Sequence, residues 1–356
     1  CIRDRRVGVV TNDQGRYLVD TLFFRSEKVP AVEVTGGCFC CNFDDFEERL
    51  ASLDKAERPD VIFAESVGSC ADVVATVVQP LLTLGQSGFI PTSFSVFTDS
   101  RLISHRMSGL PLPFSDDVVY IFDKQLEEAG LVVINKADLL GPAELDDVLE
   151  KARAAFPDKR VVSQDSLNPG AIARWLQLIE SETLAAPRSL EDIDYDIYGS
   201  GEEALAWLDQ ELILSFDQEN GREALRSTLL SIEQGIRGRG WAIGHLKFIV
   251  QSGGRESKIS FTTVPVDDGP PDLPQPLGRE ARLLINARVA APSGLLSRFV
   301  EKALAEAAAR HGFRFESSDT DSFHPGYPVP VHRIASKPGS PRAEKAAKEW
   351  GQVRRT

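Results

Sequence analysis

The chain has 356 residues, and 40 Lys and Arg against 53 Asp and Glu give it a formal net charge of −13. This acidic balance argues against nucleic-acid and anionic-membrane partners, because both bind basic surfaces. No apolar run approaches the roughly 20 residues of a membrane-spanning helix and no secretory signal is recognisable, so we expect a cytoplasmic protein. At roughly 100–200 residues per domain, the length of the chain predicts two domains.

Residues 1–182 alternate short apolar runs, rich in β-branched residues, with segments in which apolar residues recur at helical spacing. Such alternation predicts a mostly parallel sheet that is covered by helices on both faces, an α/β domain of the nucleotide-binding type. The predicted strands cover residues 6–10, 31–34, 61–64, 94–98, 131–134 and 160–162.

A polar, acidic stretch at residues 183–201 predicts a linker to a second domain over residues 202–335. There the runs at 206–216, 244–250, 258–263 and 282–289 alternate with helical patterns, which predicts a smaller α+β domain of ferredoxin-like type. Residues 336–356 are rich in Lys, Arg, Ala and Pro and predict a disordered basic tail.

The motif Asn135-Lys136-Ala137-Asp138 directly follows the apolar run at 131–134. One carboxylate can accept both N–H donors on the guanine edge, so Asp138 would select guanine, while Asn135 and Lys136 hold the loop and cover the base. Ligands bind at the carboxyl ends of parallel strands, which favours a guanine site over a chance loop sequence.

Three cysteines lie together in Gly36-Gly37-Cys38-Phe39-Cys40-Cys41, between a predicted strand and a predicted helix. Thiolates are soft ligands for Zn²⁺ or Cu(I), and the glycines allow a sharp turn that aims several sulfurs inward. A metal site made by Cys38, Cys40 and Cys41 is the leading interpretation, with Cys70 as a candidate fourth ligand. A redox role and a buried turn of small residues are the alternatives.

Glu65 ends the apolar run at 61–64 and is followed by Ser66-Val67-Gly68. A phosphate-binding site places its acidic Mg²⁺ partner at such a strand end, together with a glycine that can approach the γ-phosphate. Glu65 and Gly68 are therefore candidate catalytic residues.

Together these motifs resemble the CobW-type GTPases, relatives of the UreG and HypB metallochaperones, over about residues 6–180. The Gly-Cys-x-Cys-Cys element is the most specific mark of that family. The matching segments, in family order, are Asn12-Asp13-Gln14-Gly15 with Asp20 beyond it, Gly37 to Cys41, Glu65 to Gly68 with Ala71-Asp72, Gln125, and Asn135 to Asp138.

The resemblance implies a GTPase that uses Mg²⁺ and couples GTP binding and hydrolysis to delivery of Zn²⁺ or Co²⁺. The recipient would be a client metalloprotein or a cobalamin-related protein, and the GTPase itself is a candidate homodimer. The cysteines would bind the metal, Glu65 would serve Mg²⁺ and the attacking water, and Gly68 the γ-phosphate. Asp20 would lie in the first switch region, and Ser163 in a loop that touches the guanine.

No Gly-x-x-x-x-Gly-Lys-[Ser/Thr] phosphate-binding loop occurs in the 356 residues, although the family carries one ahead of the Asn12 segment. We therefore expect an incomplete GTPase domain whose first strand and loop lie upstream of Cys1, with GTP hydrolysis if that loop exists. The alternative is a nucleotide-independent metal-binding or adaptor protein on a degenerate GTPase scaffold. An enzyme-reactivation partner of a cobalamin-dependent protein is a third reading.

The histidines add weaker signals. His245 lies in a predicted strand, where a structural role is the default interpretation. His324 and His332 flank a Pro-rich segment, which either packs on the second domain or offers a second metal site.

Overall fold

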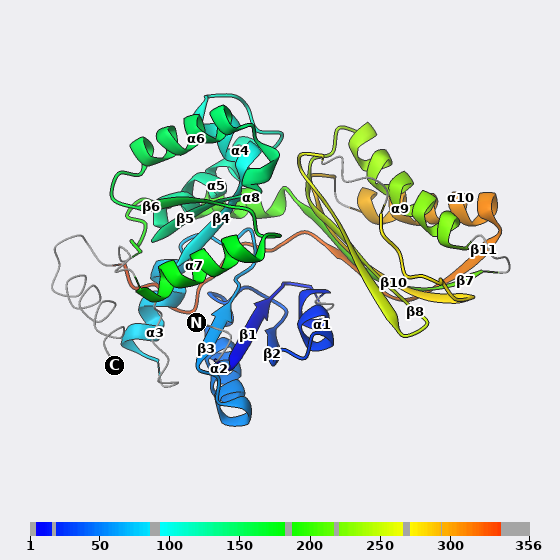
Figure 1. The fold of residues 1–356 in the computed structure, drawn as a ribbon, viewed down its shortest axis with the longest axis horizontal. Coiled ribbons are helices and arrows are strands. Elements are labelled where there is room, and N and C mark those ends of the chain that lie inside the picture. Colours follow the sequence, from blue (N-terminus) through cyan, green and yellow to red (C-terminus); the bar gives the residue numbers. More distant parts are fainter. Residues whose placement is uncertain are drawn as a thin grey trace.

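The computed structural model describes residues 5–15, 19–85, 93–181, 187–216, 221–265, 271–292 and 294–335. Its N-terminal half contains parallel sheets flanked by helices, and its C-terminal half is one antiparallel sheet that carries two helices on one face (Figure 1). In these ranges no helix is both long and apolar enough to cross a bilayer. The tail predicted over 336–356 lies outside the described residues.

The first sheet has β1 (Val7–Asn12) at its centre, between β2 (Ala31–Val34) and β3 (Val61–Ala64). All three strands are parallel, so they end at the same edge of the sheet. The connections run through α1 (Val19–Ser26) and α2 (Phe43–Glu57), and α2 buries the apolar stripe that its sequence spacing predicted.

The second sheet has the order β4 (Ser95–Asp99), β5 (Leu131–Asn135) and β6 (Arg160–Gln164), again parallel. The first four residues of β5 are fully buried, as its uninterrupted apolar run predicts for a strand covered on both faces. The accompanying helices are η2 (Val74–Val78, a π-helix), α3 (Gln79–Thr83), α4 (Ser100–Met107), α5 (Asp116–Glu128), η3 (Ala137–Leu139, a 3₁₀-helix), α6 (Pro142–Ala155) and α7 (Pro169–Ser181).

Among the described residues, β3 and β4 are the two edge strands at which the parallel sheets stop short of each other. Trp175 of α7 bridges them: its ring centroid lies 5.9 Å from that of Phe63 on β3 and 5.5 Å from that of Phe97 on β4. Phe97 is nevertheless 44% exposed. Two strand edges with unpaired backbone groups therefore lie on either side of one indole.

The C-terminal sheet has the order β11-β7-β10-β8-β9 with every neighbouring pair antiparallel. Without β9, this is the β-α-β-β-α-β arrangement of a ferredoxin-like domain, which the sequence predicted. The strand β11 was not predicted. The elements are β7 (Ala206–Phe216), α9 (Gly221–Gly238), β8 (Ile243–Ser252), β9 (Arg255–Thr262), β10 (Glu280–Val289), α10 (Leu295–His311) and β11 (Phe313–Phe323).

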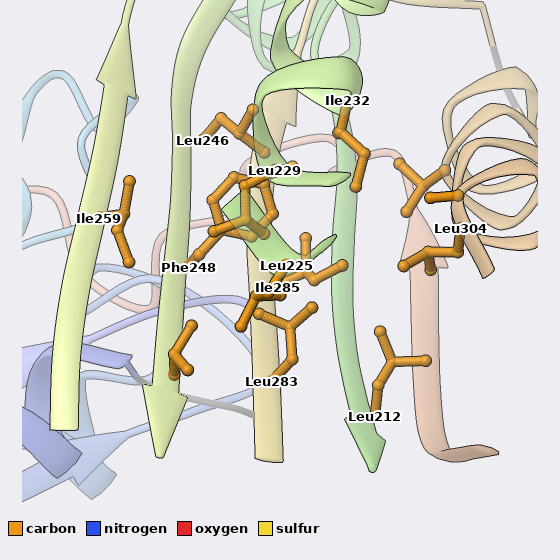
Figure 2. Close-up of a cluster of buried hydrophobic side chains, with 14 of the residues drawn as sticks. Leu212, Leu225, Leu229, Ile232, Leu246, Phe248, Ile259, Leu283, Ile285 and Leu304 are labelled. Carbon is orange, nitrogen blue, oxygen red and sulfur yellow. The ribbon is translucent and has the colours of Figure 1, made fainter. Parts of the chain in front are cut away.

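Alternation along these strands gives the C-terminal sheet two different faces. On β10, Leu283 and Ile285 point to the helices, and Figure 2 shows them packed with Leu225 and Leu229 of α9 in a continuous apolar core. The intervening residues point the other way, toward the N-terminal half. Period-two patterning thus places the main core on one side, while the other side carries polar residues such as Asn286 and Arg288 together with the buried apolar pair Leu284 and Ile249.

Buried charges occupy that second face. Arg288 of β10 is 3% exposed and donates hydrogen bonds to Asp209 of β7 at 2.8 Å and to Asp13 after β1 at 2.7 Å. Its guanidinium also lies over the Trp207 ring, 3.6 Å from the centroid. A Cβ on Gly15 would stand 1.6 Å from the Asp209 carboxylate, so only glycine fits there.

Part of the stretch expected as a linker is helical. The helix α8 (Tyr195–Glu203) begins at Asp194, whose carboxylate accepts hydrogen bonds from the backbone N–H groups of Asp196 and Ile197. It packs against α5 at Gly201, where a Cβ would stand 2.6 Å from the Asp117 carbonyl. The acidic composition hid a short capped helix.

Beyond β11 the chain returns to the N-terminal half as residues 324–335, which we call the C-terminal strap (orange to red in Figure 1). Its backbone N–H groups at Val331 and Ile334 donate to the carbonyls of Cys40 and Ala75 at 2.9 and 2.8 Å. The second half of the chain is therefore attached to the first at both of its ends.

Candidate functional site

The cysteine turn (Gly36 to Cys41) joins β2 to α2, and Asn12 at the end of β1 holds it in shape. The Asn12 amide donates to the carbonyls of Val34 and Gly37 at 3.1 and 2.8 Å, and its oxygen accepts from the Phe39 N–H at 2.9 Å. Gly36 adopts φ 75°, a left-handed conformation that suits glycine. The turn is thus built by a neighbouring strand as well as by its own sequence.

The turn brings three sulfur atoms together. The Sγ of Cys38 lies 2.7 Å from that of Cys40 and 3.3 Å from that of Cys41, while Cys40 and Cys41 are 3.8 Å apart. Cys38 and Cys40 are each 2% exposed, and Cys41 is half-buried. Within the described part of the chain, these form the one group of three or more possible ligand atoms close enough to share an ion.

The spacing fits a metal. A tetrahedral Zn²⁺ with Zn–S bonds of about 2.3 Å separates its sulfurs by about 3.8 Å. Cys40 and Cys41 already have this spacing, and the sulfurs of Cys38 and Cys40 would move apart by about 1 Å to admit the ion. Hydrogen bonds from the neighbouring thiols, that of Cys40 first, lower the pKa of Cys38, while the Cys38 sulfur raises the pKa of Cys40. The cluster therefore releases one proton readily and the next with difficulty, unless a cation replaces it.

The carboxylates predicted for Mg²⁺ and the first switch region lie at the edge where β1 and β3 end. Glu65 follows β3, and its N–H donates to the Val10 carbonyl at 3.0 Å. Its side chain is exposed, but surrounding protein atoms and the charge of Asp20 raise its pKa. Glu65 and Asp20 therefore lie close enough for the charge of Asp20 to raise the pKa of Glu65.

Asp20 is held by the second domain. Its two carboxylate oxygens accept from Lys247 of β8 and Lys258 of β9, each at 2.7 Å. Although burial acts against ionisation, these two ammonium groups keep the pKa of Asp20 below its ordinary value. Sequence reasoning missed both lysines, since nothing in a strand pattern tells which face meets another domain.

Gly68 follows Glu65 in an exposed loop, and a Cβ there would meet open space. The Gln125 amide of α5 anchors this loop by donating to the carbonyls of Gly68 and Cys70 at 2.8 and 2.9 Å. The structure thus keeps the surface above Gly68 uncovered.

The predicted guanine motif follows β5. Lys136 adopts φ 57°, and its backbone oxygen accepts from the Ser100 hydroxyl at 2.8 Å. The Lys136 ammonium donates to Asp99 at 3.0 Å and to Thr262 of β9 at 3.2 Å, so the second domain reaches this loop too. Asp138 lies exposed in the first turn of η3.

Ser163 is placed within β6, opposite Ile134, and not in the loop beside the motif. Ser166 takes that place: its N–H donates to the Asn135 side-chain oxygen at 3.2 Å. The strand runs two residues beyond its predicted end at 162, to Gln164, so Ser163 lies in the strand, and its contact with guanine stays a prediction.

The histidines take other partners. The ring of His245 is half-buried and lies 2.6 Å from the Asn286 side-chain oxygen, and the surrounding protein lowers its pKa, which fits a neutral structural histidine. His332 lies edge-on to Phe43, and His324 hydrogen-bonds to the Glu203 carbonyl. The Pro-rich segment that they flank is the strap, which packs on the first domain and not only on the second.

Several known proteins resemble this chain over part of its length. Residues 1–163 match the CobW/HypB/UreG nucleotide-binding domain. The curated "Zinc chaperone CobW" of a Sinorhizobium species is 23% identical over 221 residues, which are 56% of this chain and 62% of that protein. The chain thus matches less than two thirds of its relative's length.

Two solved structures are similar at lower identity. Zn(II)-bound YjiA GTPase from E. coli is 12% identical, with 85% of this chain and 90% of that one covered at a TM-score of 0.34. A LAO/AO transport system kinase is 16% identical, with 65% and 68% covered at a TM-score of 0.31. The family that this chain resembles is thus CobW/HypB/UreG, and the resemblance covers residues 1–163.

Proposed function

We propose that this protein is a GTP-dependent metallochaperone that binds Zn²⁺ at the cysteine turn and releases it to a client metalloprotein. The convergence of the thiols of Cys38, Cys40 and Cys41 carries the proposal, because three soft ligands within 3.8 Å of each other have few purposes besides holding a soft or borderline metal. The relative described as a zinc chaperone supports Zn²⁺ as the cargo, and Co²⁺, with similar ligand preferences, is the second candidate.

The nucleotide would bind along the carboxyl ends of the two parallel sheets. In this proposal Asn135, Lys136 and Asp138 recognise guanine, and Glu65 holds Mg²⁺ and orients the attacking water, while the backbone at Gly68 approaches the γ-phosphate. These residues lie at the carboxyl end of β5 or in the segments that follow β3 and β5, and the open surface above Gly68 leaves room for a phosphate.

Hydrolysis also needs a phosphate-binding loop, which these 356 residues lack. The unpaired edges of β3 and β4 suggest where it belongs: a further parallel strand between them would join the two sheets and deliver its loop to the same edge as Glu65 and Asn135. The exposed ring of Phe97 and the bridging indole of Trp175 would then be covered.

Coupling between nucleotide and cargo would run through two contacts. Asn12 ties the cysteine turn to the end of β1, and Asp20 joins the first switch region to Lys247 and Lys258 of the second domain. A nucleotide-dependent movement of this edge would therefore reach both the metal site and the C-terminal sheet.

Metal and nucleotide titrations test the proposal. We expect the reduced protein to bind one Zn²⁺ through thiolates and Cys40→Ser to lose that binding. With a phosphate-binding strand and loop joined ahead of residue 5, the protein should hydrolyse GTP with Mg²⁺ in preference to ATP. Asp138→Asn should abolish the preference, because the paired acceptor for guanine is lost.

Unchanged Zn²⁺ affinity in Cys40→Ser would refute the thiolate site. Equal affinities for Zn²⁺ with a GTP analogue, with GDP and without nucleotide would refute the coupling. Zn²⁺ binding without any GTP hydrolysis in this extended protein would favour the nucleotide-independent adaptor.

A further inference from the structure

A fourth thiol, that of Cys70, lies against the cysteine turn although it comes from a different part of the chain. It belongs to the segment between β3 and η2, is 4% exposed, and packs beside the thiols of Cys38 and Cys40 in one buried cluster. Thirty residues of sequence separate it from Cys40, so only the folded chain brings its sulfur to those of Cys38 and Cys40, although it stays outside the set of three that lie within 4.8 Å of one another.

A three-thiol site leaves one position of a tetrahedral ion to be filled. Zn²⁺ sites in which protein residues supply all four ligands hold the ion firmly, whereas three protein ligands leave a position open to water or substrate. The neighbourhood offers few alternatives to Cys70. The Glu202 carboxylate already accepts from the Ser69 hydroxyl at 2.7 Å, and the His332 ring packs on Phe43.

We propose that Cys70 is the fourth thiolate ligand of the metal site, so that the ion is held by two segments of the chain and not by the turn alone. This inference rests on the proposed function, because it needs the turn to bind a metal. It adds which residue completes the coordination and where that residue lies.

The position of Cys70 gives the fourth ligand a second consequence. Gln125 holds the carbonyls of both Gly68 and Cys70 with the same amide nitrogen, at 2.8 and 2.9 Å. A sulfur ligand two residues beyond Gly68 therefore shares its anchor with the segment proposed to meet the γ-phosphate. Movement of that segment would withdraw one of four ligands and leave the three of the turn, which is a weaker and more open site.

The test uses Zn²⁺ and Co²⁺ as probes of the reduced, metal-free chain. Cys70→Ala should lower the affinity for Zn²⁺, measured by competition with a chromophoric chelator, by about 100-fold, a quarter of the binding free energy of a four-ligand site. The intensity of the thiolate-to-Co²⁺ charge-transfer band should fall by about a quarter, because one of four thiolate ligands is lost. Val67→Ala, in the same segment and equally buried, is the matched control and should change neither readout.

The wild-type protein gives a measurement that does not depend on how a variant folds. X-ray absorption at the zinc edge should show four sulfur ligands at about 2.3 Å. Three sulfurs with one nitrogen or oxygen would overturn the inference, as would Cys70→Ala with unchanged affinity and charge-transfer intensity. If either result appears while Cys40→Ser loses the metal, Cys70 is not a ligand but the proposed function stands. If Cys40→Ser also binds Zn²⁺ normally, the proposed function itself is wrong.

Discussion

Glu128, at the end of α5, is a carboxyl group that this fold should keep protonated at neutral pH. It is fully buried, one of its oxygens accepts from the Val74 N–H at 3.0 Å at the start of η2, and the other has no hydrogen-bond partner. Burial raises the pKa of Glu128 to about 8. Its charge state therefore bears on the segment that carries Cys70 and Asp72.

The direction in which pH changes the stability follows from the number of protons bound by the folded and the unfolded protein. An exposed glutamate in the unfolded chain titrates near its ordinary pKa of 4.5, so between pH 5 and 8 the folded protein binds one more proton than the unfolded one. This part of the stability is complete below the unfolded pKa and is lost as pH rises through about 8. From pH 5.5 to 8 the loss amounts to about 3 kcal/mol.

Glu128→Gln removes the titration and retains an acceptor for the Val74 N–H. We expect its free energy of unfolding, from urea denaturation with reductant and chelator present, to equal that of the wild type near pH 5.5 and to exceed it by about 2–3 kcal/mol at pH 8. Glu127→Gln is the matched control, since that carboxylate is 53% exposed and pairs with Lys124. It should keep the wild-type pH dependence.

The comparison of Glu128→Gln with the wild type decides whether Glu128 is protonated in the folded protein. If the wild type and Glu128→Gln lose stability in parallel from pH 5.5 to 8, the carboxyl is ionised in the folded protein and the assignment of a neutral Glu128 is wrong.

Two further variants test the contacts that join the halves of the chain. Arg288→Met should lower the free energy of unfolding, measured by urea denaturation, by about 3–5 kcal/mol, because it leaves the fully buried Asp209 without its cation. The double variant with Asp209→Asn should recover part of this loss. If it recovers none, the two residues do not depend on each other as proposed. Arg333→Met should free the strap from the buried Asp72, which its guanidinium meets at 2.7 Å, and speed iodoacetamide alkylation of the thiols in the cysteine turn severalfold. Arg188→Met, at an exposed pair, should not change that rate, and equal rates in all three proteins would show that the strap does not shield the turn.

The sequence predicted the parts of this fold that follow from local pattern. The strands β2 and β3 have the predicted bounds, and the other four strands of the first half differ by one or two residues at their ends, because apolar runs bounded by polar residues report burial directly. β11 escaped detection because its sequence, rich in Ser and Asp, places it at a sheet edge with little apolar content.

The candidate site divides in the same way. Sequence spacing alone put Cys38, Cys40 and Cys41 in one turn, since a turn is local. The partners that come from elsewhere, such as Cys70 beside them or Lys247 and Lys258 on Asp20, depend on tertiary packing that no window of sequence contains. The end of β6 was predicted two residues too early for a third reason: the exact end of a strand is set by its neighbour, here β5, which pairs with β6 as far as Gln164.

The strap changes what a break in the chain would do. α8 leads into the C-terminal sheet and the strap leads out of it, and both are fixed to the first domain, through Tyr198 in one case and Arg333 in the other. A protease that cuts one of these connections leaves the other intact, so the two halves stay at a high effective concentration and re-associate after each opening. The same double tether limits the second domain to pivoting about its base, and full departure would require both anchors to release together.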